Sequence, residues 1–190
     1  GYPTQPSQIL EGPSSNAYYG WKLLPLGDFD GDGKADVAIA AMGANDGLGA
    51  IYIHRGSASG LSTTPLQTLT GSAPGLYFGR VADSGDTNGD GIADIVVGAP
   101  SPTPGIPGMV WVYRGSTRGY TNTRAETLFA PVALDDGDSF GDSLSLLGDV
   151  DGDGHVDLAV AATMPFNVQP SSGLIALFYG SATGLGSSGR

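Results

Sequence analysis

Three nine-residue segments hold more than half of the acidic side chains of this 190-residue chain, in a spacing that suits a metal ion. Each segment has an oxygen-bearing side chain at positions 1, 3, 5 and 9 and a glycine at positions 4 and 6. The segments are Asp28–Asp36, Asp86–Asp94 and Asp149–Asp157. Carboxylates packed this closely repel one another unless a cation lies between them, and hard oxygen ligands are those that Ca²⁺ prefers. The spacing predicts three Ca²⁺ sites.

The seventh position of each segment is expected to add a backbone carbonyl, because the glycines let the chain curl until this oxygen points inward. The predicted metal ligands, segment by segment, are Asp28, Asp30, Asp32, Lys34 and Asp36; Asp86, Asn88, Asp90, Ile92 and Asp94; and Asp149, Asp151, Asp153, His155 and Asp157. Asn88 leaves the second site one charge poorer, so we expect it to bind Ca²⁺ most weakly. The imidazole of His155 is expected to face solvent.

Two other interpretations of these segments fit the sequence less well. An EF-hand loop needs a bidentate glutamate at position 12 and flanking helices. Position 12 here is Ile39, Val97 or Val160, each inside an apolar run typical of a β-strand. Turns without a metal have no need for oxygen side chains at the same four positions in all three segments. The Ca²⁺ interpretation is therefore preferred.

The charge and composition exclude several classes of protein. The net charge is −11, and three doubly charged ions would bring it to about −5. Only 8 Lys and Arg residues and no basic run argue against nucleic-acid binding. The chain has no Cys, hence no disulfide or thiolate zinc site, and no apolar stretch long enough to span a membrane. The N-terminus does not resemble a signal peptide. Weak multi-aspartate sites fill in the Ca²⁺-rich space outside cells, so an extracellular or cell-surface location is expected.

The segments around the acidic turns predict an all-β protein of short strands and tight turns. The chain has 32 Gly and 13 Pro but only 14% charged residues. Each acidic segment is preceded by an aromatic-Gly pair and a strand and followed by an apolar strand, a variable loop and a strand that ends in Gly-Ser. A further short strand precedes each unit, at 4–11, 64–71 and 124–129. Tyr52 and Trp111 occupy matching positions and are expected in the core.

The repeat length favours propeller blades. Asp28 and Asp86 lie 58 residues apart, and Asp86 and Asp149 lie 63 apart. A four-stranded unit of this period suits a β-propeller blade better than a solenoid coil. We expect one propeller-type domain over 1–190, with repeats at approximately 4–61, 62–119 and 120–185. The acidic turns then share one face, and loops such as 13–17, 42–48, 72–77, 101–107 and 133–139 share the opposite face.

The second repeat resembles an FG-GAP repeat, the unit of integrin α-subunit propellers and of many bacterial extracellular proteins. The resemblance rests on Phe78-Gly79, the Asp86–Asp94 turn and Gly98-Ala99-Pro100. The first and third repeats keep the full acidic turn but depart at the flanking motifs, for example at Tyr19-Gly20. The resemblance implies Ca²⁺ between the first two strands of each blade, a propeller that usually has seven blades, and a role in adhesion or ligand binding.

Three blades alone would expose the apolar faces on which blades pack. One hypothesis is a homodimer that closes a six-bladed ring, in which each N-terminal strand completes the last blade of the other chain. The alternatives are a fragment of a longer propeller, or a further partial element supplied from elsewhere.

A binding function is expected rather than catalysis. The sequence has no Gly-x-Ser-x-Gly elbow and no His-Glu-x-x-His helix, and acids committed to Ca²⁺ cannot act as proton donors near neutral pH. We expect a calcium-stabilised module that binds a protein partner through the face opposite the acidic turns. The alternatives are a carbohydrate-binding propeller lectin and an accessory domain of a secreted hydrolase. Trp21 stands where the other repeats have Arg80 and Asp142, so it is expected either to be exposed for stacking on a sugar or to pack at an edge.

Overall fold

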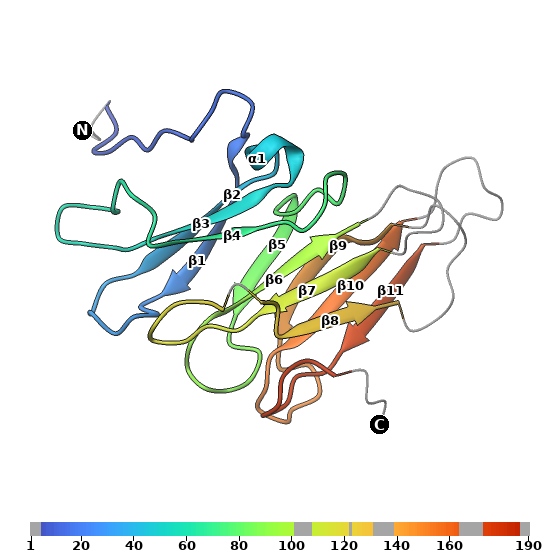
Figure 1. Cartoon of the computed structure of the whole chain (residues 1–190). Coiled ribbons are helices and arrows are strands. Elements are labelled where there is room, and N and C mark those ends of the chain that lie inside the picture. The colour runs from blue at the N-terminus through green and yellow to red at the C-terminus, as the bar shows by residue number, and fades with distance from the viewer. Residues whose placement is uncertain (1–4, 101–107, 122, 131–138, 164–172, 187–190) are drawn as a thin grey trace.

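The computed structural model describes residues 5–100, 108–121, 123–130, 139–163 and 173–186. These residues form three antiparallel sheets that follow one another along the chain (Figure 1). The first contains β1 (Tyr19–Gly27), β2 (Asp36–Ala41), β3 (Ala50–His54) and β4 (Gln67–Thr70); the second contains β5 (Val81–Gly85), β6 (Asp94–Ala99), β7 (Met109–Tyr113) and β8 (Glu126–Phe129); the third contains β9 (Ser139–Gly148), β10 (Asp157–Thr163) and β11 (Leu174–Phe178). The chain is all-β and built of propeller-type blades.

Each sheet is an up-and-down meander in which sequential strands are neighbours. The first two sheets have four strands, and the described part of the third has three. The one helical element in the described residues, α1 (Ala44–Gly47), is a short turn in which Asn45 and Asp46 have positive φ. No described helix is long and apolar enough to cross a membrane.

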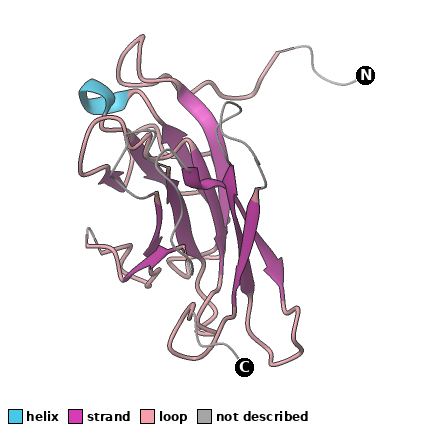
Figure 2. Ribbon diagram, turned by 90° about the vertical axis from the view of Figure 1, so that its right-hand side faces the viewer, coloured by secondary structure: helices cyan, strands magenta, loops and turns pink. Residues whose placement is uncertain are grey.

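The blades stack face to face because the second strand of each sheet is apolar on both sides. Alternate residues of β6 face different neighbours: Ile95 and Val97 pack on the first sheet, and Val96 packs on the third. Figure 2 shows the strands of the stacked sheets running side by side. For β6 this double burial confirms the expectation that the strand lies between layers.

The aromatic-Gly pairs have a structural role in the second and third blades. Phe78 and Phe140 are fully buried, and the glycines that follow them have φ of 82° and 89°. Trp111 is 1% exposed and packs on Phe78 with ring centroids 5.5 Å apart, so the prediction that it lies in the core is confirmed. Tyr52 is only partly buried and packs on Tyr19.

The strand expected at 4–11 is wrong for its described residues, 5–11, which form no strand and are mostly exposed. A short extended segment is not stable as a strand without a neighbour to bond to, and no described strand pairs with it. The equivalent strands expected at 64–71 and 124–129 are present as β4 and β8. The expected loops at 101–107 and most of 133–139 lie outside the described residues.

Candidate metal centre

Each acidic segment forms the turn of a hairpin between the first two strands of a blade. Strand pairing brings the residue before the segment next to its ninth residue, as in Gly27 with Asp36 and Gly148 with Asp157. The glycines at positions 4 and 6 have φ between 77° and 92° in all three copies. A side chain is strained at such angles, which explains why both positions are glycine.

The ninth-position aspartates tie each hairpin to the third strand. Asp36, Asp94 and Asp157 are at most 1% exposed. Each accepts a hydrogen bond from the N–H of the second residue of its own segment and another from a glycine that follows the third strand. The donors are the N–H groups of Phe29 and Gly56, of Thr87 and Gly115, and of Val150 and Gly180, at 2.8–3.2 Å. We call this arrangement the aspartate clasp.

The spacing of the acidic segments does not predict the glycines of the clasp. A Cβ on Gly56 would lie 2.2 Å from the carbonyl oxygen of Ala35, and one on Gly115 would lie 2.4 Å from that of Ala93. Only glycine fits that close to the turn. The Gly-Ser pair that recurs after each third strand is the sequence feature that marks these glycines.

The first-position aspartates organise the turn itself. Their carboxylates accept the N–H groups of positions 5 and 6, at 2.7–3.1 Å, in all three copies. Asp28, Asp86 and Asp149 are those acceptors. The fifth-position carboxylates accept the N–H of position 7, donated by Lys34, Ile92 and His155. The turn is therefore wound around its own acidic side chains.

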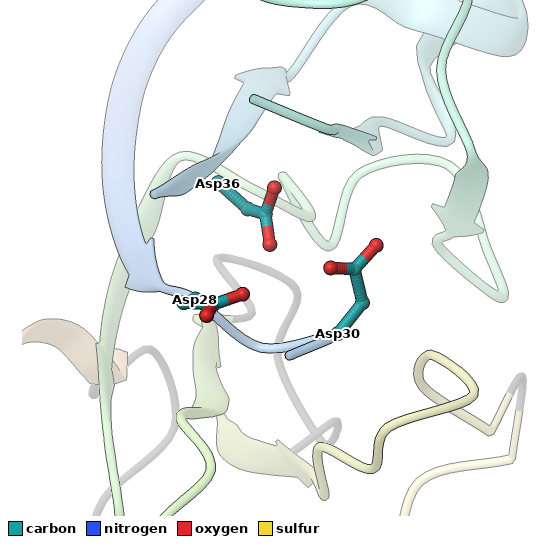
Figure 3. A group of neighbouring side chains, drawn as sticks. All are labelled: Asp28, Asp30 and Asp36. Carbon is teal, nitrogen blue, oxygen red and sulfur yellow. The ribbon is translucent and has the colours of Figure 1, made fainter. Parts of the chain in front are cut away.

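Two of the three segments gather carboxylates closely enough to share a cation. Asp28, Asp30 and Asp36 place one oxygen each within 4.8 Å of the others (Figure 3). Asp149, Asp151 and Asp153 do the same. Oxygens that share a Ca²⁺ lie about 2.3–2.6 Å from the ion, so these separations suit one bound ion.

The second segment differs because Asn88 replaces an acid. Its amide donates to Asp90 at 3.0 Å, and the Thr87 hydroxyl donates to Asp94. Among the described residues of this segment, no three carboxylates come together as they do in the other two. Internal hydrogen bonds here take up part of the oxygen set that would hold an ion.

Two basic side chains lie close to the turns. Arg55 pairs with Asp30 at 2.6 Å, and the Asp30 side chain is only 7% exposed. The imidazole of His155 lies against the second turn, 3.1 Å from where a Cβ on Gly89 would stand, and its Nδ1 is buried without a hydrogen-bond partner. The expectation that this imidazole faces solvent is wrong, because stacking of the third blade on the second covers it.

The electrostatics of the clasp favour a bound cation. Burial raises the pKa of Asp36 and Asp94 above the ordinary value, although the N–H groups bonded to each act against this shift. Nearby carboxylates add to the increase, Asp30 and Asp32 for the first and Asp90 for the second. The pKa of the exposed Asp149 is lowered by backbone hydrogen bonds, and the bond from the N–H of Gly154 has the largest effect. A cation beside the buried carboxylates would favour their charged form.

Calcium affinity should fall as the pH is lowered from 7 to 5. A raised pKa in the folded state favours the protonated acid, so the ion-free protein gains stability as the pH falls, and the proton then competes with Ca²⁺. Calorimetric titration is expected to show a several-fold larger dissociation constant for Ca²⁺ at pH 5 than at pH 7. An affinity that stays constant over this range would contradict the prediction.

The blades and their acidic hairpin turns define a propeller-type repeat protein. An FG-GAP-like repeat matches residues 28–97, and an FG-GAP repeat matches residues 140–178. The chain belongs to the FG-GAP repeat family and is integrin alpha-like.

Curated relatives extend over most of the chain. It is 32% identical to Integrin alpha-PS2 of Drosophila melanogaster over 177 residues, which is 90% of this chain and 12% of that protein. It is 31% identical to Integrin alpha-V of Gallus gallus over 193 residues, 94% of this chain and 17% of that protein. A third relative, Integrin alpha-E of Homo sapiens, is 38% identical over 67% of this chain and covers 11% of that protein. The chain therefore spans less than a fifth of the length of these relatives.

Proposed function

We propose that this chain is a calcium-stabilised extracellular module that binds a protein partner without catalysis, through the blade ends opposite the acidic turns. The observation that carries the proposal is a strip of exposed aromatic side chains, Tyr18, Trp21 and Tyr77, which are 59%, 50% and 42% exposed. They lie at or just before the beginnings of β1 and β5, whereas the acidic turns follow the ends of these strands. We call them the aromatic strip.

The strip is held in place by specific contacts across two blades. Tyr18 and Trp21 meet edge to face, with ring centroids 6.3 Å apart. The Trp21 Nε1 donates to the carbonyl of Arg80 at 3.0 Å, and the Arg80 guanidinium lies 5.7 Å from the centre of the Tyr77 ring. The side chains are therefore ordered although they are exposed.

The backbone of the strip is strained. Tyr18 and Tyr77 have φ of 52° and 50°, in the left-handed region that bulky residues rarely adopt. Such strain costs roughly 1–3 kcal/mol per residue and is found most often where function requires it. Aromatic residues and arginine are also the side chains that dominate binding at protein interfaces.

The loops beside the strip offer a further contact surface. Residues 14–16 and α1, with Gly43 before it, line one hollow in the blade end opposite the acidic turns. This agrees with the expected sharing of one face by 13–17 and 42–48. Asn45 and Asp46 in this hollow also have positive φ.

A carbohydrate ligand is the second candidate, because an exposed Trp21 beside Tyr18 could also stack on a sugar ring. An accessory domain of a secreted hydrolase is the third candidate. The two ligand classes are separated by testing the chain in Ca²⁺ on immobilised extracellular-matrix proteins and on a glycan array.

Trp21→Ala is expected to reduce binding to an immobilised matrix protein at least tenfold, since loss of a central aromatic anchor costs about 2 kcal/mol or more. Phe129→Ala is the matched control, because Phe129 is 52% exposed but lies on the outer strand β8. The control should bind as the natural chain does. Binding of the natural chain to glycans but not to matrix proteins would favour the lectin. An equal loss of binding in Trp21→Ala and Phe129→Ala would show that the aromatic strip is not the binding surface.

The proposal includes three Ca²⁺ per chain, held by the fifteen predicted ligands. It is supported by the two clusters of three carboxylates within 28–36 and 149–157, and by the same turn conformation in 86–94. Asn88→Asp is expected to strengthen the second site about tenfold, because each added charge in the ligand set raises Ca²⁺ affinity. Calorimetry should show this, with Asp90→Asn as the opposite control. A natural second site that binds most tightly of the three would contradict the ranking.

A further inference from the structure

Tyr120 lies between the first and the second acidic turns and contacts both. It belongs to the loop between β7 and β8 of the second blade and is only 5% exposed. Its ring packs on Phe29, the second residue of the first acidic segment, with ring centroids 5.8 Å apart. Its hydroxyl donates to the carbonyl oxygen of Ala93, the eighth residue of the second segment, at 2.7 Å. One buried side chain therefore joins two predicted metal sites.

Both contact points are next to an aspartate clasp. The N–H of Phe29 donates to Asp36 at 3.2 Å, and Ala93 directly precedes Asp94 in the chain. Asp36 and Asp94 are the buried ninth-position ligands of the two segments. Burial, followed by the charges of Asp94 and Asp36, raises the pKa of the Tyr120 hydroxyl. The phenol therefore lies within the electrostatic influence of both carboxylates.

The main chain of Tyr120 is fixed by the first blade. The side-chain amide of Gln67, on β4, accepts a hydrogen bond from the N–H of Tyr120 at 2.8 Å and donates one to its carbonyl oxygen. A Cβ on Gly119 would lie 2.7 Å from the Gln67 Oε1, so the glycine leaves room for this amide. Tyr120 is thus held by its main chain on the first blade and by its hydroxyl on the second acidic turn.

The junction between the second and third blades lacks the equivalent hydrogen bond. Leu185 follows the third strand of the third blade as Tyr120 follows that of the second, each after a Gly-Ser-x-x-Gly run. Leu185 is 5% exposed and lies in the core cluster that the second and third blades share. A leucine side chain packs but cannot donate to a turn carbonyl. The link made by the hydroxyl therefore distinguishes the first junction from the second.

This chain of contacts can carry a free energy of coupling between the two turns. The carboxylates of an ion-free turn repel one another, and a shared cation draws them together. In the first turn this fixes Asp36 and, through its hydrogen bond, Phe29. Tyr120 packs on Phe29 and bonds to Ala93, so the same event also orders the main chain beside Asp94. Order that one ion has already imposed need not be imposed again by the next, and the coupling is then positive.

We propose that Tyr120 couples the first and second Ca²⁺ sites, so that an ion bound within 28–36 raises the affinity of 86–94. The inference rests on the proposed binding of Ca²⁺ by these turns. Linkage makes the effect equal in the opposite direction, and couplings between sites are typically about 5–150-fold. Tyr120 is a positioning residue, because it contacts the main chain of the turns and is not itself a predicted ligand.

Calorimetric Ca²⁺ titration of three variants measures the coupling. Asp149→Ala keeps the first and second sites, whereas Asp86→Ala/Asp149→Ala keeps only the first and Asp28→Ala/Asp149→Ala keeps only the second. The constant for loading both sites of Asp149→Ala is expected to exceed the product of the two single-site constants about tenfold. Tyr120→Phe, added to all three, keeps the ring on Phe29 but removes the hydroxyl. This ratio should then fall to about one.

A control pair of sites separates this coupling from a general effect of ions on folding. Asp86→Ala keeps the first and third sites, which lie on blades separated by the second. Compared with its own single-site variants, it should give a ratio of about one. Circular dichroism should show the same β-sheet spectrum for every variant before titration.

Three results would overturn the proposal. They are a ratio of about one in Asp149→Ala, a ratio that Tyr120→Phe leaves unchanged, and an equally large ratio for the control pair. In each of these cases the single-site variants still bind Ca²⁺, and the proposed metal sites stand. Single-site variants that bind no Ca²⁺ would overturn the metal sites as well, so the two failures are distinguishable.

Discussion

Removing Ca²⁺ is expected to lower the melting temperature of this protein by about 15 °C or more. An ion that binds only the folded state adds about 2.7 kcal/mol when its concentration is 100-fold above the dissociation constant. Three such sites would together contribute about 8 kcal/mol, and each kcal/mol shifts the melting temperature by about 2–4 °C in a domain of this size.

Thermal unfolding followed by circular dichroism in about 10 mM Ca²⁺ and in excess EDTA measures this difference, if the sites have dissociation constants near 10⁻⁴ M. Mg²⁺ at the same concentration is the control, because it demands near-ideal octahedral geometry and gives up its waters reluctantly. Coincident melting curves with and without Ca²⁺ would mean that the acidic turns stabilise the blades without an ion.

The second large effect is expected from Asp94→Ala, which should lower the free energy of unfolding by about 3–5 kcal/mol even without Ca²⁺. Asp94 is fully buried and accepts the N–H groups of Thr87 and Gly115 as well as the Thr87 hydroxyl. Its loss leaves three buried donors without an acceptor, in addition to removing a predicted metal ligand.

Asp90→Ala is the matched control for Asp94→Ala. Asp90 is exposed and belongs to the same segment. Urea unfolding in EDTA should show a small loss for Asp90→Ala and a large one for Asp94→Ala, whereas in Ca²⁺ both should lose stability. Equal losses for the two variants in EDTA would contradict the structural role of the aspartate clasp.

The strands and turns near each motif could be predicted from the sequence because their signals are local. The apolar run after each acidic segment and the glycines at positions 4 and 6 indicate a hairpin whose second strand is buried on both sides. β6 has that form throughout, whereas Val37 of β2 and Ala159 and Ala161 of β10 are only partly buried. The burial of Trp111 also followed from its place in the repeat.

Contacts between distant segments could not be predicted in the same way. Gly56 bonds to Asp36 from 20 residues away, and His155 is covered only because the third blade packs on the second. Residues 5–11 have a strand-like sequence but form no strand, because the bonding partner that a strand requires is not on the described part of this chain. Nor does the spacing of oxygens reveal that Asn88 would bond to Asp90 and leave the second turn without a cluster of three carboxylates.

We propose that each of the three acidic hairpin turns holds one Ca²⁺. Native mass spectrometry during a Ca²⁺ titration measures this directly. Three ions per chain are expected at saturation, and two in Asp28→Ala and in Asp149→Ala. No bound Ca²⁺ at millimolar concentration, or three ions still bound in both variants, would contradict it.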